Sequence, residues 1–294
     1  MTGHEPPFVS TNRLKSIFVA VYSIAVVVVA VGSVLGVLFS DYPVAWAGAL
    51  LTVLPFLALY LWATRTGSLA RTSRYLPVAS AITLGGLAVS IFGASKGQPP
   101  AALPLLAAAV GTAGFFLYDV WYSSLGKRIN DCLAEGRLLP DFQARDVEGR
   151  EVRASDLRGH KALFMFYRGN WCPFCMAQVK EITGKYRELA ALGVELVLIS
   201  PQPTDLTERV ADMFQVPCRF WVDDNLGAAR ELGIVHEHGV PAGSLTRTYG
   251  EDTVLPTVII VNAEGRILFT DQTDNYRIRP DPEDFLKALR ARSA

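Results

Sequence analysis

The chain has 294 residues, half of them hydrophobic, and its 28 basic and 28 acidic residues give a formal net charge of zero. It contains no basic run with interleaved aromatic residues, which argues against a nucleic-acid partner. The charges are unevenly placed: residues 1–136 hold 8 Lys or Arg and 5 Asp or Glu, whereas residues 137–294 hold 20 and 23. The length of the chain and the uneven placement of its charges together predict an apolar part followed by a part of ordinary soluble composition.

Four uncharged apolar stretches dominate the first part, at residues 17–39, 44–63, 76–94 and 101–118. Each has roughly the 20 residues that a helix needs to cross a bilayer core. The first stretch is too long for a signal peptide and lacks a clean cleavage site, so we interpret it as a retained anchor. The pattern predicts an all-α bundle of four transmembrane helices over residues 1–122, with the lipid bilayer as its partner.

Basic residues that flank the predicted spans are concentrated on one side, and only Lys96 lies on the other. Those on the first side are Arg13, Lys15, Arg65, Arg71, Arg74, Lys127 and Arg128. The positive-inside rule then places the N-terminus and the C-terminal part of this cell-membrane protein in the cytoplasm.

The predicted spans contain neither Cys nor His, and the one nearby carboxylate is Asp119, at the end of the fourth span. Ionisable groups inside a membrane usually mark function, so their scarcity indicates helices that anchor the chain and do not carry electrons. We therefore expect a fragment that starts near Leu138 to keep its redox chemistry.

Residues 123–137 are predicted to form a linker helix, and residues 138–294 a separate domain. Continuous apolar runs at 162–167 and 194–200 indicate strands covered on both faces. Helices are expected at 176–192, 205–214, 226–232 and 282–291. Further strands are expected around residue 142, after Gly149, and at 218–222, 258–261 and 267–270. A hairpin turn joins the last two strands. This alternation predicts an α/β domain.

The motif Cys172-Pro173-Phe174-Cys175 lies where the first apolar run meets a predicted helix. Cys172 is expected at the helix N-cap, with Pro173 at the first helical position, where a missing N–H is harmless. The helix dipole and the free amides favour a Cys172 thiolate, and Cys175 lies one turn away, within disulfide reach. The alternative, half of a structural zinc site, lacks a second ligand pair. The spacing favours a redox-active dithiol, with no metal or cofactor.

The second part resembles the thioredoxin superfamily, and more narrowly the alkyl hydroperoxide reductase/thiol-specific antioxidant group of peroxiredoxin-like redoxins. The resemblance rests on the order of motifs over residues 137–292. These motifs are Pro140-Asp141-Phe142, Asp146 with Gly149, Ser155-Asp156-Leu157-Arg158-Gly159, the dithiol helix, and Leu255-Pro256-Thr257 before a strand. It implies a thioredoxin-like α/β fold and antioxidant thiol chemistry.

At the level of single residues, the chain matches the peroxiredoxin pattern at some positions and the thioredoxin pattern at others. Alignment on the peroxiredoxin motif puts Arg168 at its proline, Cys172 at its threonine and Cys175 at its peroxidatic cysteine, while the active-site arginine of that group falls near Pro256. Pro256 instead matches the proline that faces the dithiol in thioredoxins. Residues 162–167 lack the buried carboxylate that assists thioredoxins. Arg168 either replaces the missing arginine electrostatically or belongs to a surface ion pair.

Three hypotheses follow. The first is a thiol–disulfide oxidoreductase in which Cys172 attacks a protein or small-molecule disulfide and Cys175 resolves the mixed disulfide that forms. Pro256 would hold the backbone of the partner against the dithiol, and a thiol reductant would restore the dithiol. The second is a thiol peroxidase that reduces hydroperoxides, and the third is a redox-sensing membrane scaffold.

Other polar residues are weaker candidates. Cys132 is expected to be a bystander, Cys218 a buried thiol or a resolving cysteine, and His236 and His238 either loop residues or an incomplete metal pair. Residues 276–280, which include two arginines, are a further candidate for the pocket rim.

Overall fold

The computed structural model describes residues 11–96, 101–128 and 130–291. It divides into two compact units. The bundle unit comprises residues 1–65 and 73–124, and the redox unit comprises residues 66–72 and 125–294. The redox unit is therefore discontinuous in sequence, because a short segment between two apolar helices belongs to it.

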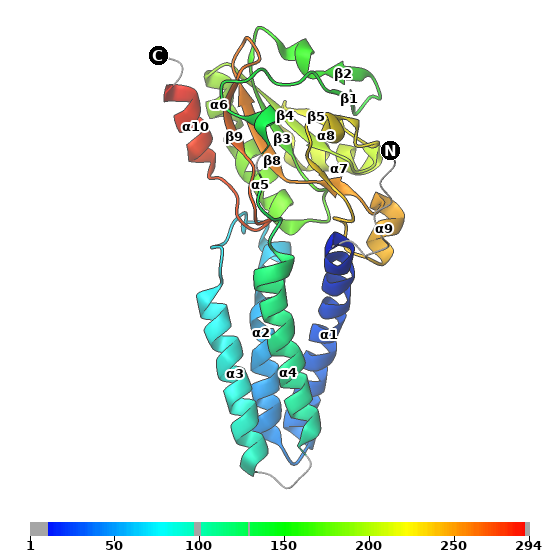
Figure 1. Cartoon of the computed structure of the whole chain (residues 1–294), viewed down its shortest axis with the longest axis vertical. Helices are drawn as coiled ribbons and strands as arrows, with labels where there is room; N and C mark the ends of the chain where they lie inside the picture. The colour runs from blue at the N-terminus through cyan, green and yellow to red at the C-terminus, as the bar shows by residue number, and fades with distance from the viewer. Residues whose placement is uncertain (1–10, 97–100, 129, 292–294) are drawn as a thin grey trace, which may run out of the picture. The chain divides into compact units, whose positions relative to one another are not determined.

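The bundle unit consists of four long helices (Figure 1). They are α1 (Thr11–Phe39), α2 (Pro43–Thr66), α3 (Pro77–Lys96) and α4 (Ala102–Phe116), the last continued by a π-helix, Leu117–Tyr122. All four are long and apolar enough to cross a membrane. The predicted all-α bundle is confirmed, and the four candidate spans indicate a multi-pass membrane protein.

Close packing in the bundle depends on small residues and on a buried carboxylate. A Cβ atom at Gly48 of α2 would lie 2.6 Å from the carbonyl oxygen of Gly86 in α3, so these two backbones are in contact. Asp119 is buried and accepts a hydrogen bond of 3.4 Å from the Leu76 N–H, immediately before α3. Because helix N-termini leave N–H groups without partners, this contact gives Asp119 a structural role.

The redox unit contains a seven-stranded mixed sheet in the order β2-β1-β5-β4-β3-β8-β9 (Figure 1). Its strands are β1 (Gln143–Asp146), β2 (Glu151–Arg153), β3 (Lys161–Phe166), β4 (Val194–Ser200), β5 (Arg219–Val222), β8 (Thr257–Val261) and β9 (Ile267–Asp271), and a separate pair is β6 (Val235–His236) with β7 (Thr253–Val254). Its helices are α5 (Pro173–Gly184), α6 (Tyr186–Ala191), α7 (Thr204–Phe214), α8 (Gly227–Glu231), α9 (Ser244–Tyr249) and α10 (Pro282–Ala291). This is the predicted thioredoxin-like α/β fold.

Strand β3 lies at the centre of the sheet, parallel to β4 and antiparallel to β8. Successive side chains of a strand point to opposite faces, and every residue from Ala162 to Phe166 is buried. Phe164 and Phe166 pack with Phe142 and Trp221 on one face. The continuous apolar run in the sequence thus reflects a strand covered on both sides.

Two local expectations differ from the structure. The single helix expected over 176–192 is two helices, because α5 ends at Gly184 and Lys185 leaves helical geometry (φ −92°, ψ 7°) before α6. Glycine is a poor interior helix residue, which favours a break at this point. In place of a linker helix over 123–137, the described residues form a 3₁₀ turn, Asp131–Leu133, with the Asn130 side chain accepting from the Cys132 N–H.

Candidate active site

The dithiol lies at the junction of β3 and α5. Cys172 is the N-cap of α5 and Pro173 follows at the first helical position, as the sequence predicts. The approach to the helix requires Gly169, whose φ of +136° disfavours any side chain and whose Cβ position would meet the Trp171 indole at 2.8 Å. The Cys172 carbonyl accepts from the Cys175 N–H at 3.0 Å, so the two cysteines lie within one turn of each other.

The two thiols are free, fully buried and electrostatically unequal. Burial alone would raise the pKa of Cys172, but the Cys175 thiol that donates to it and the Arg168 and Arg279 guanidinium groups lower that pKa to about 6. Burial and the neighbouring Cys172 sulfur raise the pKa of Cys175 well above its ordinary value. Cys172 is therefore the thiolate near neutral pH, and Cys175 keeps its proton.

Arg168 is buried, with 4 % of its surface exposed, which contradicts the alternative of a surface ion pair. Its guanidinium donates to the Gly239 carbonyl and lies 4.7 Å from the Trp171 ring centroid and 5.6 Å from that of Tyr276. Arginine stacks well on aromatic faces. These contacts hold a positive charge beside the Cys172 sulfur.

A second buried arginine, Arg279, belongs to the run that the sequence offered only as a candidate for the pocket rim. Its Nη2 atom lies 3.7 Å from Cys175 Sγ, and its side chain is 4 % exposed. The only sequence signal was the arginine-rich run at residues 276–280. Tyr276 of the same run packs edge-on against Phe174, between the two cysteines, with ring centroids 5.5 Å apart.

A half-buried carboxylate accompanies Arg279 and Arg128, although the strand before the motif offers none. It belongs to Asp271, at the end of β9. Burial raises the pKa of Asp271 to about 6, and the attraction of Arg279 and Arg128 only partly offsets this. Asp271 thus acts on the site through its attraction to Arg279, from the end of a strand that the sequence predicted without assigning it a carboxylate role.

Pro256 precedes β8, whose first residue, Thr257, pairs with Phe166 at the end of β3. Pro256 therefore lies beside the end of β3 from which the chain continues to the dithiol helix. Its carbonyl accepts from Arg128 Nη1 at 3.0 Å, and the N–H of the preceding Leu255 donates to Ile234 at 2.7 Å. A partner that pairs with this backbone has to displace these contacts.

Of the weaker candidates, Cys132, Cys218 and His238 lie outside this arrangement. Burial raises the pKa of Cys218 to about 12, which leaves it a poor nucleophile, and Cys132 is exposed. His238 Nδ1 lies 2.9 Å from a Glu251 carboxylate oxygen, on the β6–β7 side of the unit. Within the described ranges, no three His, Cys, Asp or Glu side chains are grouped as a metal site requires.

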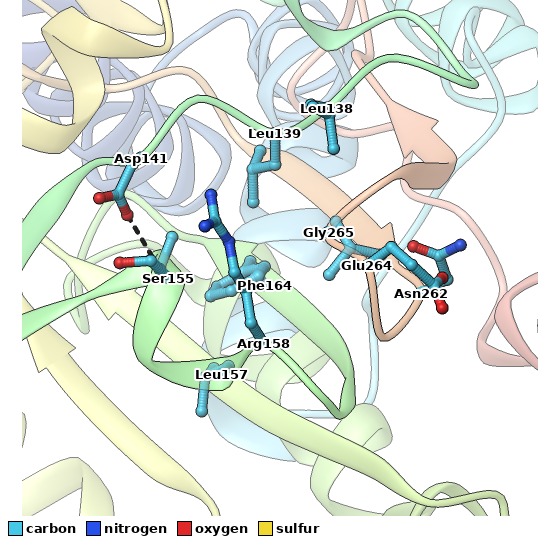
Figure 2. A pocket seen from close by; sticks show the side chains of 12 residues that line it. Leu138, Leu139, Asp141, Ser155, Leu157, Arg158, Phe164, Asn262, Glu264 and Gly265 are labelled. Atoms are coloured by element: carbon cyan, nitrogen blue, oxygen red, sulfur yellow. Dashed lines mark hydrogen bonds between the residues drawn. The ribbon is translucent and has the colours of Figure 1, made fainter.

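A small cavity of about 20 Å³ lies between the Ala154–Leu157 turn and the β8–β9 hairpin (Figure 2). Its walls include Leu139, Phe164 and Glu264, and the Ser155 N–H donates to Asp141 at its rim. The volume suits about one water molecule. None of the dithiol residues lines it, so it is not part of the site.

A buried dithiol at the start of the helix that follows the central strand of a mixed sheet defines the thioredoxin-like class of redox proteins. Residues 136–270 match the model of the AhpC/TSA family. The chain therefore carries a redoxin domain of the AhpC/TSA family, preceded by four long apolar helices, and is an oxidoreductase.

The redox unit is similar in sequence to named proteins and in fold to solved structures. Thiol-disulfide oxidoreductase ResA of Bacillus cereus is 25% identical over 182 residues, which cover 61% of this chain and 89% of that protein. ResA of Geobacillus thermodenitrificans is 26% identical over 166 residues, which cover 56% of this chain and 80% of that protein. Among solved structures, the peroxidoxin BcpB of Mycobacterium tuberculosis aligns with a TM-score of 0.47 and 19% identity, over 55% of this chain and 99% of that one.

Proposed function

We propose that the chain is a membrane-anchored thiol–disulfide oxidoreductase whose redox unit faces the cytoplasm. The observation that carries the proposal is the inequality of the two thiols: the pKa of Cys172 is lowered to about 6, whereas that of Cys175 is raised. A nucleophile that is ionised near neutral pH beside a thiol that keeps its proton suits sequential attack and resolution.

The reaction proceeds in two exchanges. The Cys172 thiolate attacks one sulfur of a substrate disulfide, the substrate S–S bond breaks, and a mixed disulfide forms while one substrate thiolate leaves. Cys175 then gives its proton to that departing thiolate and attacks the Cys172 sulfur, which releases the second substrate thiolate. The products are the Cys172–Cys175 disulfide and a reduced substrate, and a thiol reductant is needed to return the two electrons.

Two features of the site support these steps. Arg168 and Arg279 favour the Cys172 thiolate of the resting state. Arg279, 3.7 Å from Cys175 Sγ, also favours the thiolate that forms there during resolution. A positive group that stabilises charge as it develops lowers the barrier to that step.

A second candidate function is thiol peroxidase, and Arg279 is the observation that favours it. The peroxiredoxin alignment places Cys175 at the peroxidatic position, and a guanidinium beside this sulfur supplies the cation that the aligned sequence lacks near Pro256. In this function the Cys175 thiolate attacks the terminal oxygen of a hydroperoxide, the O–O bond breaks and an alcohol (or water) leaves, and Cys175 becomes a sulfenic acid. Cys172 then converts the sulfenic acid to a disulfide with loss of water.

A stopped-flow comparison separates the two functions. The reduced full-length protein in detergent micelles is mixed with either hydrogen peroxide or an oxidised protein substrate. The change in tryptophan fluorescence, to which Trp171 next to Cys172 contributes, reports oxidation. The first proposal expects faster oxidation by the disulfide. Faster oxidation by peroxide, with no reduction of the disulfide, would replace it with the peroxidase function.

A further inference from the structure

The position of Arg279 is not explained by its own side-chain contacts. The side chain is buried, yet its Nε atom has no hydrogen-bond partner, and in the described part of the chain no carboxylate lies within salt-bridge distance of it. Its Nη2 atom contacts the Cys175 sulfur at 3.7 Å. A buried charge without a close ion pair is unfavourable, so the backbone that carries Arg279 must be held from elsewhere.

That backbone is the strap segment, residues 272–281, between β9 and α10. Two residues before Arg279, the Arg277 carbonyl accepts from the Thr72 N–H at 2.9 Å, and Arg277 Nη1 donates to Thr72 Oγ1 at 2.9 Å. One residue after it, the Pro280 carbonyl accepts from Arg71 Nη2 at 3.3 Å. The strap segment is thus fastened on both sides of Arg279 by residues 66–72, which we name the clamp segment.

Arg71 also contacts the helix that carries the dithiol. Its guanidinium pairs with Glu181 of α5, and its Nη1 atom lies 3.4 Å from an Asp281 carboxylate oxygen in the strap segment. Glu181 follows Cys175 by about two turns of the same helix. One guanidinium therefore links the helix that carries the Cys175 sulfur to the segment that carries Arg279.

We propose that the clamp segment is part of the redox centre and that Arg71 is a positioning residue, which keeps the Arg279 guanidinium against the Cys175 sulfur and so controls the charge at the dithiol. The clamp segment begins at the last residue of α2 and forms the first part of the connection to α3, so it lies between the second and third candidate spans. This inference deepens the proposed function and rests on it only in taking Cys172 as the thiolate.

The surroundings of Arg71 make it suitable for substitution. Its side chain is 31% exposed and borders an open groove of about 520 Å³, which is also lined by Gly67 and Lys180. Shortening a side chain at the wall of an open groove leaves no closed cavity, so the usual penalty of a buried truncation is small. The expected consequence of Arg71→Gln is a loosened strap segment in a folded protein.

The test measures the pH dependence of Cys172 alkylation in the reduced full-length protein in detergent. Arg71→Gln should raise the pKa of Cys172 by about one pH unit, the effect expected from moving one nearby charge away. Arg71→Lys, which keeps the charge, should restore part of the wild-type value. The matched control is Arg145→Gln, which breaks an exposed ion pair with Asp224 (3.6 Å) and should change nothing.

A double-mutant cycle distinguishes positioning from a direct effect of charge. Arg279→Gln should raise the same pKa, and the double variant Arg71→Gln/Arg279→Gln should raise it no further. Additive shifts, or an unchanged pKa in Arg71→Gln, would overturn the proposal. If Arg71→Gln does not fold, Thr72→Val, which removes the hydroxyl that Arg277 contacts, carries the same expectation.

The outcome also separates this proposal from the proposed function. If alkylation of the wild type modifies Cys175 first, the assignment of Cys172 as nucleophile fails. The clamp proposal is then tested by measuring the pKa of Cys175 in Arg71→Gln, Arg279→Gln and the double variant, because Arg279 lies beside that sulfur.

Discussion

The Nη2 atom of Arg279 lies 3.7 Å from Sγ of Cys175, although 104 residues separate the two in the chain. Arg168 approaches the same dithiol from the turn that precedes α5. Two guanidinium groups therefore surround a pair of fully buried sulfurs. Their positive charge favours one thiolate in the pair, and the N-cap position assigns that thiolate to Cys172.

The order of alkylation should follow from this asymmetry. Iodoacetamide is expected to modify Cys172 first, with a rate that rises through a midpoint near pH 6, since the pKa of this thiol is lowered to about 6. Cys175 should react only at alkaline pH, because its pKa is raised. Peptide mass spectrometry after timed quenching identifies the modified residue. Equal labelling of both cysteines at pH 7 would contradict the assignment.

Trapping experiments should identify the resolving cysteine. Cys175→Ser is expected to accumulate mixed disulfides with partner proteins through Cys172, and Cys172→Ser to form none. Non-reducing electrophoresis of the two variants makes the comparison, with Cys218→Ser as a matched control that should behave as the wild type. Rapid capture of a sulfenic acid at Cys175 by dimedone in the Cys172→Ser variant would support the peroxidase function instead.

Removal of Arg279 should make the dithiol more reducing. The reduced form is stabilised by the Cys172 thiolate, so Arg279→Gln, which raises the pKa of Cys172, destabilises that form. A rise from about 6 to about 7 lowers the reduction potential at pH 7 by about 20 mV. Equilibration with dithiothreitol redox buffers measures the change, and Arg279→Lys should show a smaller one. A potential that becomes less negative would refute the electrostatic role.

Asp271 should make stability depend on pH in a direction opposite to that of most carboxylates. Its pKa is raised to about 6, so the folded state favours the protonated form, and this stabilisation is lost as pH rises from about 4 through 6. Asp271→Asn imitates the protonated form and should be more stable than the wild type at pH 8, by up to about 3 kcal/mol, and similar at pH 4. Thermal unfolding at both values tests this, and a lower Tm at pH 8 would contradict it.

The membrane orientation is testable with reporter fusions. If basic residues hold the redox unit in the cytoplasm, alkaline phosphatase fused after Arg137 should be inactive and green fluorescent protein at the same point fluorescent. Active phosphatase would place the dithiol in an oxidising compartment. Its role would then shift to disulfide formation or isomerisation, or to maturation of thioether-linked cytochromes.

The parts of the fold and site that the sequence predicted are those set by local chemistry. Cys172 at the N-cap followed by Pro173 is a short-range signal, and the structure has it in place. The run Val194–Ser200 was predicted with its observed bounds, because a strand buried on both faces needs an uninterrupted apolar sequence. The four long apolar helices were predicted for the same kind of reason: their composition alone separates them from the rest of the chain.

The parts that were missed depend on tertiary contacts. The sequence offered the run that contains Arg279 as a candidate for the pocket rim but did not indicate its contact with Cys175, because the path of the strap segment creates that contact. Likewise, Arg71 was interpreted only as a basic residue near a span, whereas the structure pairs it with Glu181 and Asp281. The break after Gly184 is a local feature that was missed for another reason: one glycine is a weak signal when the residues on either side of it keep helical propensity.

The clamp segment has a practical consequence for the design of truncated forms of this protein. A fragment from residue 138 onward would carry both cysteines and nearly all of the family match, yet lack Arg71, Thr72 and Arg128. The clamp proposal therefore opposes the expectation from the sequence that such a fragment keeps its redox chemistry. No single uninterrupted stretch of the gene outside the membrane helices encodes the whole redox unit. A water-soluble version would have to splice residues 66–72 back in by a designed linker, and its redox behaviour would depend on that splice.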